Sequence, residues 1–269
     1  MQQTIVNFKA NAMEKHVNHG KDKWVREKIM ATLNILKKNR ADEFTVFASL
    51  PDMGKVGGLV SSFLSHYLNA EPVAEIISKD KPWVSYSEGV VKSTSDVYKI
   101  SFDERYKVMI FRGESQPQDP SELYRLCNTF LDYIQSIGKV KRLYGAGGYQ
   151  REQLTGAPRV CGVVNKPELR KVLSKEGIDL VGSEITTITW FNGLILGLSG
   201  ERGIDAIGLF GEIAESTIPQ PLAAKSIISA FSKLEQIPID TKPLDVEYES
   251  ILEEMQKKKE PSKFGQGIS

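Results

Sequence analysis

A strand, a glycine-containing turn and a helix follow one another at residues 44–69, and this segment constrains the fold more than any other. Residues 44–50 are mostly aromatic, apolar or β-branched, which predicts a buried strand. The turn spans residues 51–58, and residues 59–68 are typical of a helix. In α/β proteins, elements in this order form a ligand crevice at the carboxyl end of a sheet. The pattern therefore predicts an α/β fold.

The turn combines glycines with charged residues in a way that suits a ligand site. Gly54, Gly57 and Gly58 let the backbone turn sharply and approach a partner closely, and Asp52 and Lys55 add charge. The helix behind them presents free N–H groups, which favour an anion. The Walker A motif is not matched, because Lys55 is followed by Val instead of Ser or Thr. We favour a role in tight turns and packing, with small-ligand binding as the alternative.

A second group of glycines, Gly145, Gly147 and Gly148, follows a predicted strand at residues 140–144. We interpret this group as another sharp turn at the carboxyl end of the sheet. A dinucleotide-binding fingerprint would require a further glycine at position 150, where this chain has Gln. Neither glycine group carries a nucleotide signature, and the sequence predicts no cofactor.

Length and charge restrict the class of protein. The 269 residues suffice for one domain with a large core, and 41% of them are hydrophobic. The 35 basic and 34 acidic residues nearly cancel, so neither nucleic acid nor a membrane is an expected partner. No signal peptide or bilayer-spanning run is visible, which predicts a cytoplasmic protein. Cys127 and Cys161 lie in apolar patterns typical of buried, unreactive thiols.

The rest of the chain alternates predicted strands and helices. Strands are expected at residues 73–78, 83–91, 97–102, 106–111, 140–144, 159–164, 186–191 and 204–210, and helices at 22–38, 121–137, 167–173, 222–234 and 246–258. The alternation predicts a mixed, largely parallel sheet with helices on both faces. The strands at 83–91 and 97–102 are expected to form an antiparallel excursion. We divide the chain into an N-terminal arm and helix (1–43), an α/β core (44–240), and a C-terminal helix with a flexible tail (241–269).

Several of the predicted strands end in polar residues or glycine. These residues are Asp52, Lys55, Arg112, Glu114, Asn165, Asn192, Gly193 and Glu212. If the strands are parallel, their carboxyl ends share one edge of the sheet, where ligand sites of α/β proteins lie. Glu114 and Glu212 are the carboxylates available there for acid–base chemistry. We favour a helix cap or an ion pair with Arg112 or Lys55 over catalysis by Glu212, and no catalytic residue is assigned.

Histidine and nucleophile patterns do not indicate metal or covalent chemistry. His16 and His19 have helical spacing but fall in the N-terminal arm, and His66 falls on the surface of the helix after the first glycine turn. No cysteine or carboxylate cluster accompanies them, so no metal site is predicted. The nucleophile elbow G-x-S-x-G does not occur in the chain.

Four segments carry a combined pattern: LPDMGKVGG at 50–58, YGAGGY at 144–149, PRVCGVVN at 158–165, and FNGLILGL at 191–198 running into GIDAIGLFGE at 203–212. In order and spacing they resemble the proteasome assembly chaperone 2 family, in its archaeal and bacterial branch, over about residues 44–236. The resemblance implies a three-layer α/β fold akin to the nucleoside phosphorylases. It also implies homo-oligomers and a role in assembling proteasome α-subunits.

One departure from the family concerns the end of the chain. Family members that dock on proteasome α-rings can end in a hydrophobic residue, Tyr and any residue, whereas this chain ends in Gly267-Ile268-Ser269. Our first hypothesis is a non-enzymatic oligomeric chaperone or scaffold that binds proteasome subunits. The alternatives are an enzyme or sensor that binds a nucleoside- or phosphate-type ligand in the crevice, and a purely structural oligomer.

Overall fold

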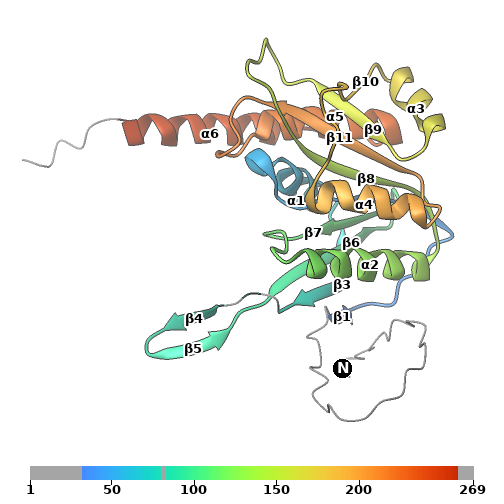
Figure 1. The fold of residues 1–269 in the computed structure, drawn as a ribbon, viewed down its shortest axis with the longest axis vertical. Helices are drawn as coiled ribbons and strands as arrows, with labels where there is room; N and C mark the ends of the chain where they lie inside the picture. The colour runs from blue at the N-terminus through green and yellow to red at the C-terminus, as the bar shows by residue number, and fades with distance from the viewer. Residues whose placement is uncertain (1–31, 80, 82, 260–269) are drawn as a thin grey trace, which may run out of the picture.

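The computed structural model describes residues 32–79, 81 and 83–259 (Figure 1). Within these residues nine strands form one sheet in the order β1-β3-β6-β7-β2-β8-β11-β9-β10. In that order their bounds are Thr32–Ile35, Glu71–Ser78, Asp96–Asp103, Val108–Arg112, Glu43–Ala48, Lys139–Gln150, Ala206–Ile213, Val160–Val164 and Asp179–Leu180. The four central strands β7, β2, β8 and β11 run parallel, whereas β1, β3 and β6 pair antiparallel with their neighbours. Strand β9 is antiparallel to β11 and parallel to β10. The predicted mixed sheet is confirmed.

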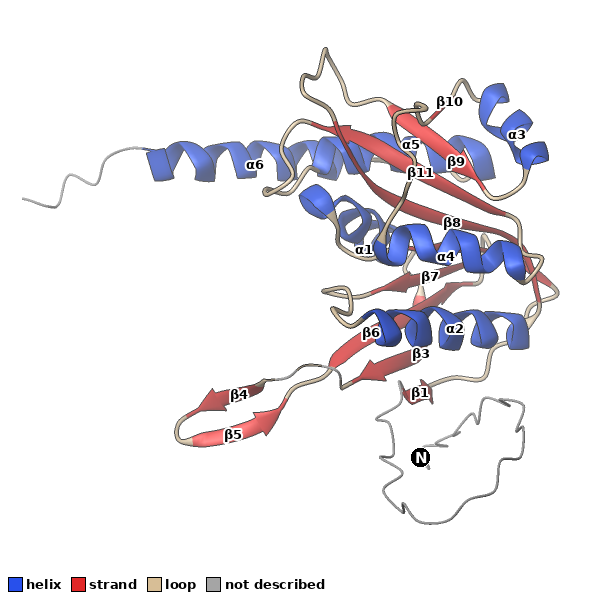
Figure 2. Ribbon diagram, viewed as in Figure 1, coloured by secondary structure: helices blue, strands red, loops and turns tan. Residues whose placement is uncertain are grey.

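Helices cover both faces of the sheet (Figure 2). Their bounds are α1 Val56–Tyr67, α2 Pro120–Ile137, α3 Arg170–Lys175, α4 Trp190–Glu201, α5 Pro221–Glu235 and α6 Lys242–Lys259, with short 3-10 turns at Met53–Lys55 and Pro167–Leu169. Helices α2 and α4 lie on one face, α1 and α5 on the other, and α6 packs on α5 and extends beyond the body of the protein (Figure 1). Among the described residues, every helix is too short or too polar to cross a bilayer.

Strand β2 illustrates why the core has two halves. Its side chains alternate between the two faces, as in any strand, yet four of the six are apolar because helices cover both faces. Val46 and Ala48 belong to the core half beneath α2 and α4. Phe47 belongs to the half beneath α1 and α5, where its ring contacts that of Phe231 at 5.1 Å. The continuous apolar run that predicted a buried strand thus serves both halves.

The antiparallel excursion expected from strands at 83–91 and 97–102 is wrong in its pairing, because residues 97–102 lie in β6 of the main sheet. The segment at 83–91 instead contains the turn of a hairpin that lies outside the main sheet. Strands β4 (Val84–Ser87) and β5 (Val90–Ser93) pair only with each other in the described chain and project from the body (Figure 1). Glu88 and Gly89 connect them, both with positive φ (49° and 81°). A two-residue turn of this kind suits the right-handed twist of a hairpin.

The helix expected over residues 22–38 is wrong where the structure describes it. Thr32–Ile35 forms β1, which pairs antiparallel with β3, and residues 22–31 lie outside the described residues. Leu33 is buried at this edge of the sheet, and the Asn34 amide donates to Glu75 Oε1 at 2.8 Å. The open edge of β3 offers backbone partners that outweigh the helical spacing of the apolar residues.

The strand expected at residues 186–191 is also wrong. Residues 186–189 form a loop, and α4 begins at Trp190. Both edges of β11, the strand that follows in sequence, are already paired, with β8 on one side and β9 on the other. The segment therefore has no strand edge to join beside β11, although its β-branched residues favour an extended chain.

Helix α2 begins at Pro120, one residue before the range expected from the sequence. Asp119 is its N-cap, because Asp119 Oδ1 accepts the N–H groups of Ser121 and Glu122 at 2.7 and 3.0 Å. Pro120 then occupies the first helical position, where its missing N–H costs nothing. Hydrogen bonds from the Ser121 hydroxyl and the Glu122 backbone hold the pKa of Asp119 below its usual range.

Glu235 fixes the end of α5 to the beginning of the central strands. Its side chain is 4% exposed and accepts the Tyr144 hydroxyl at 2.6 Å, Lys141 Nζ at 2.7 Å and Thr45 Oγ1 at 3.1 Å. Arg142 lies 3.3 Å away and is itself largely buried. A nearly buried carboxylate is tolerated here because charged and hydroxyl donors surround it.

We predict that Glu235→Ala lowers the free energy of unfolding by about 3 kcal/mol, because Arg142 and the Tyr144 hydroxyl lose their partner in a buried place. Urea denaturation measures this change. Glu71→Ala is the matched control, since the Glu71–Lys37 ion pair (2.6 Å) is exposed on both sides and its loss should leave the midpoint unchanged. Equal effects of the two substitutions would contradict the prediction.

Candidate functional site

The carboxyl ends of β7, β2, β8 and β11 meet at one edge of the sheet, as their parallel pairing requires. The structure places Asp52 and Glu114 just beyond β2 and β7 at this edge, and Glu212 near the end of β11. Asn165 does not belong with them, because β9 runs antiparallel to β11 and ends at the opposite edge. There its amide donates to Ile204 O at 2.9 Å and accepts Ala206 N–H at 2.9 Å.

Asp52 occupies the place that an external anion would take in the small-ligand alternative. Its Oδ1 accepts the backbone N–H of Gly57, in the first turn of α1, at 2.8 Å. Its Oδ2 accepts the N–H of Gly148, in β8, at 2.7 Å. The positive end of the helix is therefore compensated by a carboxylate of the same chain. A phosphate or other anion would have to displace Asp52 to use these donors.

Burial raises the pKa of Asp52 to about 6, although the two backbone hydrogen bonds and Asn192 act in the opposite direction. The carboxylate is thus held at a cost near neutral pH, and the protonated form gains population as the pH falls through about 6. Its two oxygens already accept hydrogen bonds that join β2 to α1 and β8. We therefore assign this titrating group a structural role.

The backbone conformation of the turn before α1 explains why position 54 is a glycine. Gly54 and Lys55 both adopt left-handed backbone conformations, with φ of 62° and 53°. Gly54 donates its N–H to Ser216 O at 2.7 Å and accepts the N–H of Gln220 at 2.9 Å, which ties the turn to the start of α5. A Cβ on Gly54 would lie 2.6 Å from Gln220 Cγ. Lys55 remains exposed on the outside of the turn.

Two side-chain amides hold the end of β2 against α4. Asn192, buried at 3% exposure, accepts the Leu50 N–H and donates to the Leu50 oxygen, both at 3.0 Å. Gln116 donates to the Pro51 oxygen at 2.8 Å and accepts the Phe191 N–H at 2.8 Å. The sequence singled out Asn192 but missed Gln116, which lies in a loop and has no distinguishing pattern around it.

The second glycine group is not a turn, which corrects the sequence prediction. Gly145, Gly147 and Gly148 lie inside β8, a twelve-residue strand at the centre of the sheet. Side chains would not fit there: a Cβ on Gly147 would meet Asp52 Oδ2 at 2.6 Å, and one on Gly148 would meet Met53 O at 2.6 Å. The glycines serve close approach of backbone and carboxylate to a strand.

Glycines at the starts of α1 and α4 serve packing in the same way. A Cβ on Gly58 would lie 2.7 Å from Pro51 Cγ, and one on Gly193 would lie 2.2 Å from the oxygen of Ile188. Gly57 is confined as well, because a Cβ there would lie 2.5 Å from the Leu50 oxygen. These contacts agree with the favoured interpretation of the glycines; small-ligand binding by the same residues stays a prediction.

Glu212 is paired with arginine, as favoured over catalysis, but its partners are Arg159 and Arg151 rather than Arg112 or Lys55. Its Oε1 lies 3.0 Å from Arg159 Nη2 and 3.6 Å from Arg151 Nε. Burial alone would raise the pKa of Glu212, but the hydrogen bonds and charge of Arg159 hold it below the usual range. A carboxylate held ionised in this way is a poor general acid at neutral pH.

The remaining predicted carboxylate and histidine are on the surface. The side chain of Glu114 is 91% exposed and lies 3.9 Å from Arg112 Nη1. His66 is exposed on α1, as predicted, while His16 and His19 lie outside the described residues. Over residues 32–79, 81 and 83–259, no group of His, Cys, Asp and Glu side chains is placed to hold a metal ion.

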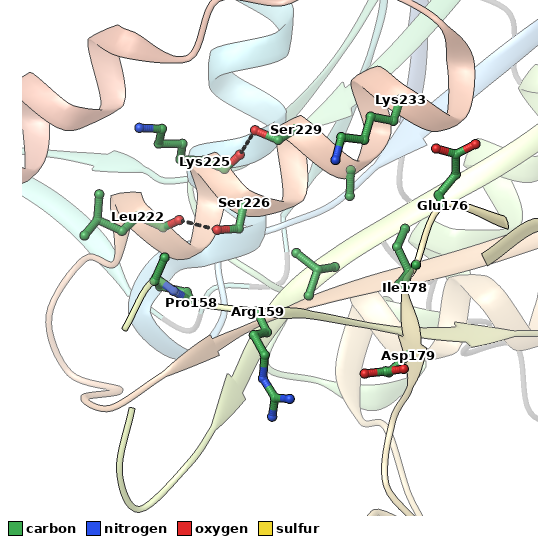
Figure 3. Close-up of a pocket in the computed structure, with 14 residues that line it drawn as sticks. Pro158, Arg159, Glu176, Ile178, Asp179, Leu222, Lys225, Ser226, Ser229 and Lys233 are labelled. Carbon is green, nitrogen blue, oxygen red and sulfur yellow. Dashed lines mark hydrogen bonds between the residues drawn. The ribbon is translucent and has the colours of Figure 1, made fainter. Parts of the chain in front are cut away.

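A separate cavity of about 420 Å³, which sequence reasoning did not find, lies between α5 and the β9–β10 side of the sheet (Figure 3). Two of its basic residues are already engaged: Arg159 with Glu212, and Lys225 with Asp245, whose Oδ1 lies 2.6 Å from Lys225 Nζ. Lys233 also lines the cavity and is exposed.

The hydroxyl groups in the α5 wall of this cavity are satisfied within the helix. Ser226 Oγ donates to the Leu222 oxygen at 3.2 Å, and Ser229 Oγ donates to the Lys225 oxygen at 2.9 Å, as the dashed lines in Figure 3 show. Glu176 and Asp179 add negative charge on the opposite wall. Mixed charge and internally bonded hydroxyls do not favour one class of ligand.

Comparison with known proteins identifies the relatives of this chain. The model of the PAC2 family matches residues 46–259. The uncharacterized protein MJ1210 of Methanocaldococcus jannaschii is 28% identical over 199 residues, which cover 73% of this chain and 75% of that protein.

Two solved structures from Pyrococcus furiosus have the same fold. PbaB, described as an archaeal proteasome activator, has a TM-score of 0.73 and 26% identity, covering 86% of this chain and 100% of PbaB. PbaA, described as an archaeal homolog of proteasome-assembly chaperone, has a TM-score of 0.68 and 18% identity, covering 84% of this chain and 95% of PbaA. At that identity PbaA supports the fold alone.

The confinement of Gly57 gives a prediction about stability. Gly57→Ala should lower the free energy of unfolding by about 1–3 kcal/mol, because the new methyl group meets the Leu50 and Ala146 oxygens at 2.5 and 2.8 Å. The matched control is Gly197→Ala in α4, which has open space around it and should gain about 0.5–1 kcal/mol. Thermal or urea denaturation measures both, and a stabilised Gly57→Ala protein would contradict the packing interpretation.

The raised pKa of Asp52 gives a prediction about pH. Because its folded pKa of about 6 lies above the unfolded value near 4, the folded state binds a proton that the unfolded chain has released. This contribution to stability is present at about pH 4 and is lost as the pH rises to about 6, with a total of about 2–3 kcal/mol. Urea denaturation across this range should show that Asp52→Asn removes the fall. Parallel pH profiles of the two proteins would contradict it.

Proposed function

This chain belongs to the PAC2 family, and from that premise we propose that it is a chaperone-like scaffold that binds proteasome α-subunits and acts as a homo-oligomer. The observation that carries the proposal is the similarity to the P. furiosus proteasome activator along the whole of that chain. The fold shared with a homolog of a proteasome-assembly chaperone supports it.

The geometry of the candidate site favours protein binding over catalysis. The donors that an anionic ligand would use, at Gly57 and Gly148, are bonded to Asp52. The buried carboxylate Glu212 is neutralised by arginine, and Glu114 faces solvent. The residues at this edge of the sheet thus stabilise the fold, and we infer that the outer surface of the protein recognises the partner.

We assign the contact with the α-subunit to helix α6. Near its beginning, Leu244 is buried and Asp245 is paired with Lys225 of α5, which orients the helix on the body. Val246, the next residue, and Leu252, in the middle of the helix, are 65% and 39% exposed, and Figure 1 shows the helix extending outwards. A projecting helix is a common means of docking into a partner. This assignment does not require a terminal tyrosine.

The test mixes the purified full chain with proteasome α-subunits of the same organism and measures complexes by light scattering and native mass spectrometry. We expect co-elution with α-subunits and a free protein with the mass of several chains. The double substitution of Val246→Asp and Leu252→Asp should weaken binding on the order of tenfold or more, because both apolar contacts are lost.

Glu114→Gln is the control, since Glu114 is an exposed residue far along the sequence from α6, and this variant should bind normally. Wild-type protein that binds no α-subunit would contradict the proposal. Stabilisation by phosphate or a nucleoside, without α-subunit binding, would favour the ligand-binding alternative instead.

A further inference from the structure

The β4–β5 hairpin has one apolar face. Tyr86 lies opposite Val91 and Val84 lies opposite Ser93, and residues paired in this way project from the same face of a ribbon. Val84, Tyr86 and Val91 are 53%, 73% and 62% exposed. The other face carries Ser85 paired with Lys92, and Ser87 paired with Val90. The hairpin therefore has an apolar and a mainly polar side.

Such a hairpin needs a packing partner. Its base is fixed, because Lys81 pairs with Asp96 at 2.7 Å and Thr94 Oγ1 donates to the Trp83 oxygen at 2.9 Å. Beyond the base, a two-stranded hairpin is at best marginally stable in water. An exposed apolar face of this kind marks a surface that another segment covers.

The described chain begins beside the end of β3 from which the chain leads to this hairpin. Thr32, the first residue of β1, pairs with Ile77, and β3 ends one residue later at Ser78, from which the chain leads to β4. Because β1 is antiparallel to β3, the chain upstream of Thr32 starts from the same end of β3 as the hairpin. Eight residues of extended chain reach about 26 Å, roughly twice the length of a four-residue strand.

The upstream residues have the composition that this face requires. Residues 22–31 contain Trp24, Val25, Ile29 and Met30 among five charged residues. We propose that this segment packs these apolar side chains on the Val84–Tyr86–Val91 face of the hairpin in the same chain. The N-terminal segment is thereby a built-in cover for the projecting hairpin, a role that goes beyond α-subunit binding.

Cross-linking of full-length double-cysteine variants tests the proposal. Trp24→Cys combined with Tyr86→Cys places thiols on the segment and on the apolar face. Trp24→Cys combined with Ser85→Cys is the matched control, because Ser85 is adjacent in sequence but lies on the other face. The native Cys127 and Cys161 are buried, and burial raises the pKa of the Cys127 thiol to about 12, so they should react little with a bismaleimide.

We expect the Tyr86 pair to cross-link within one chain, identified by peptide mass spectrometry, and the Ser85 pair not to do so. Cross-links between two chains would overturn the proposal in favour of a second copy as the occupant. Equal cross-linking on the two faces, or none on either, would also overturn it.

Hydrogen exchange provides an independent readout. In the full-length Trp24→Ser variant, amides of residues 84–93 should exchange about tenfold faster than in the wild type, because one large apolar contact is lost. Exchange in α2 should be unchanged, which shows that the body remains folded. Unchanged exchange in the hairpin with an intact body would overturn the proposal.

Discussion

The carboxylate of Asp52 joins three elements that are distant in the sequence, and the arrangement of the central layer depends on it. One oxygen is bonded to the first turn of α1 and the other to β8, while Asp52 itself follows β2. The amides of Asn192 and Gln116 secure the adjacent backbone to α4. Because each of these polar groups is satisfied, the buried joint fixes one arrangement of the three elements, even though burial makes the ionised form of Asp52 costly near neutral pH.

The hydrogen bonds of Asp52 occupy the donors of an arrangement that usually binds a ligand. Glycine turns and a helix N-terminus at the carboxyl end of a parallel sheet are typical of phosphate binding. Here the same chain supplies the anion: Gly57 and Gly148 donate their N–H groups to Asp52, and the missing side chain of Gly147 leaves room for Asp52 Oδ2. The features left for interaction are projecting ones, helix α6 and the β4–β5 hairpin (Figure 1). That distribution supports the protein-binding role that we propose for this member of the PAC2 family.

Local patterns predicted the elements whose local and tertiary preferences agree. The apolar run at 44–50 and the amphipathic pattern at 222–234 correspond to β2 and α5. Local sequence patterns gave the wrong secondary structure where the availability of a neighbouring strand edge determined it. Thr32–Ile35 became a strand because the edge of β3 was available, and residues 186–189 did not because both edges of β11 were taken. Neither fact is visible in a single segment of sequence.

The sequence by itself determined the α/β class, the two-sided helical cover and the family resemblance, because apolar periodicity and glycine spacing are properties of the chain. It also singled out Asp52, Asn192 and Glu212 as unusual. Only the tertiary structure decided what they do. Because β9 runs antiparallel to β11, Asn165 lies at the opposite edge of the sheet from the candidate site. Glu212 remains near the end of β11, where it forms an ion pair with Arg159. Direction and contact across a sheet depend on long-range pairing, which residue types alone do not encode.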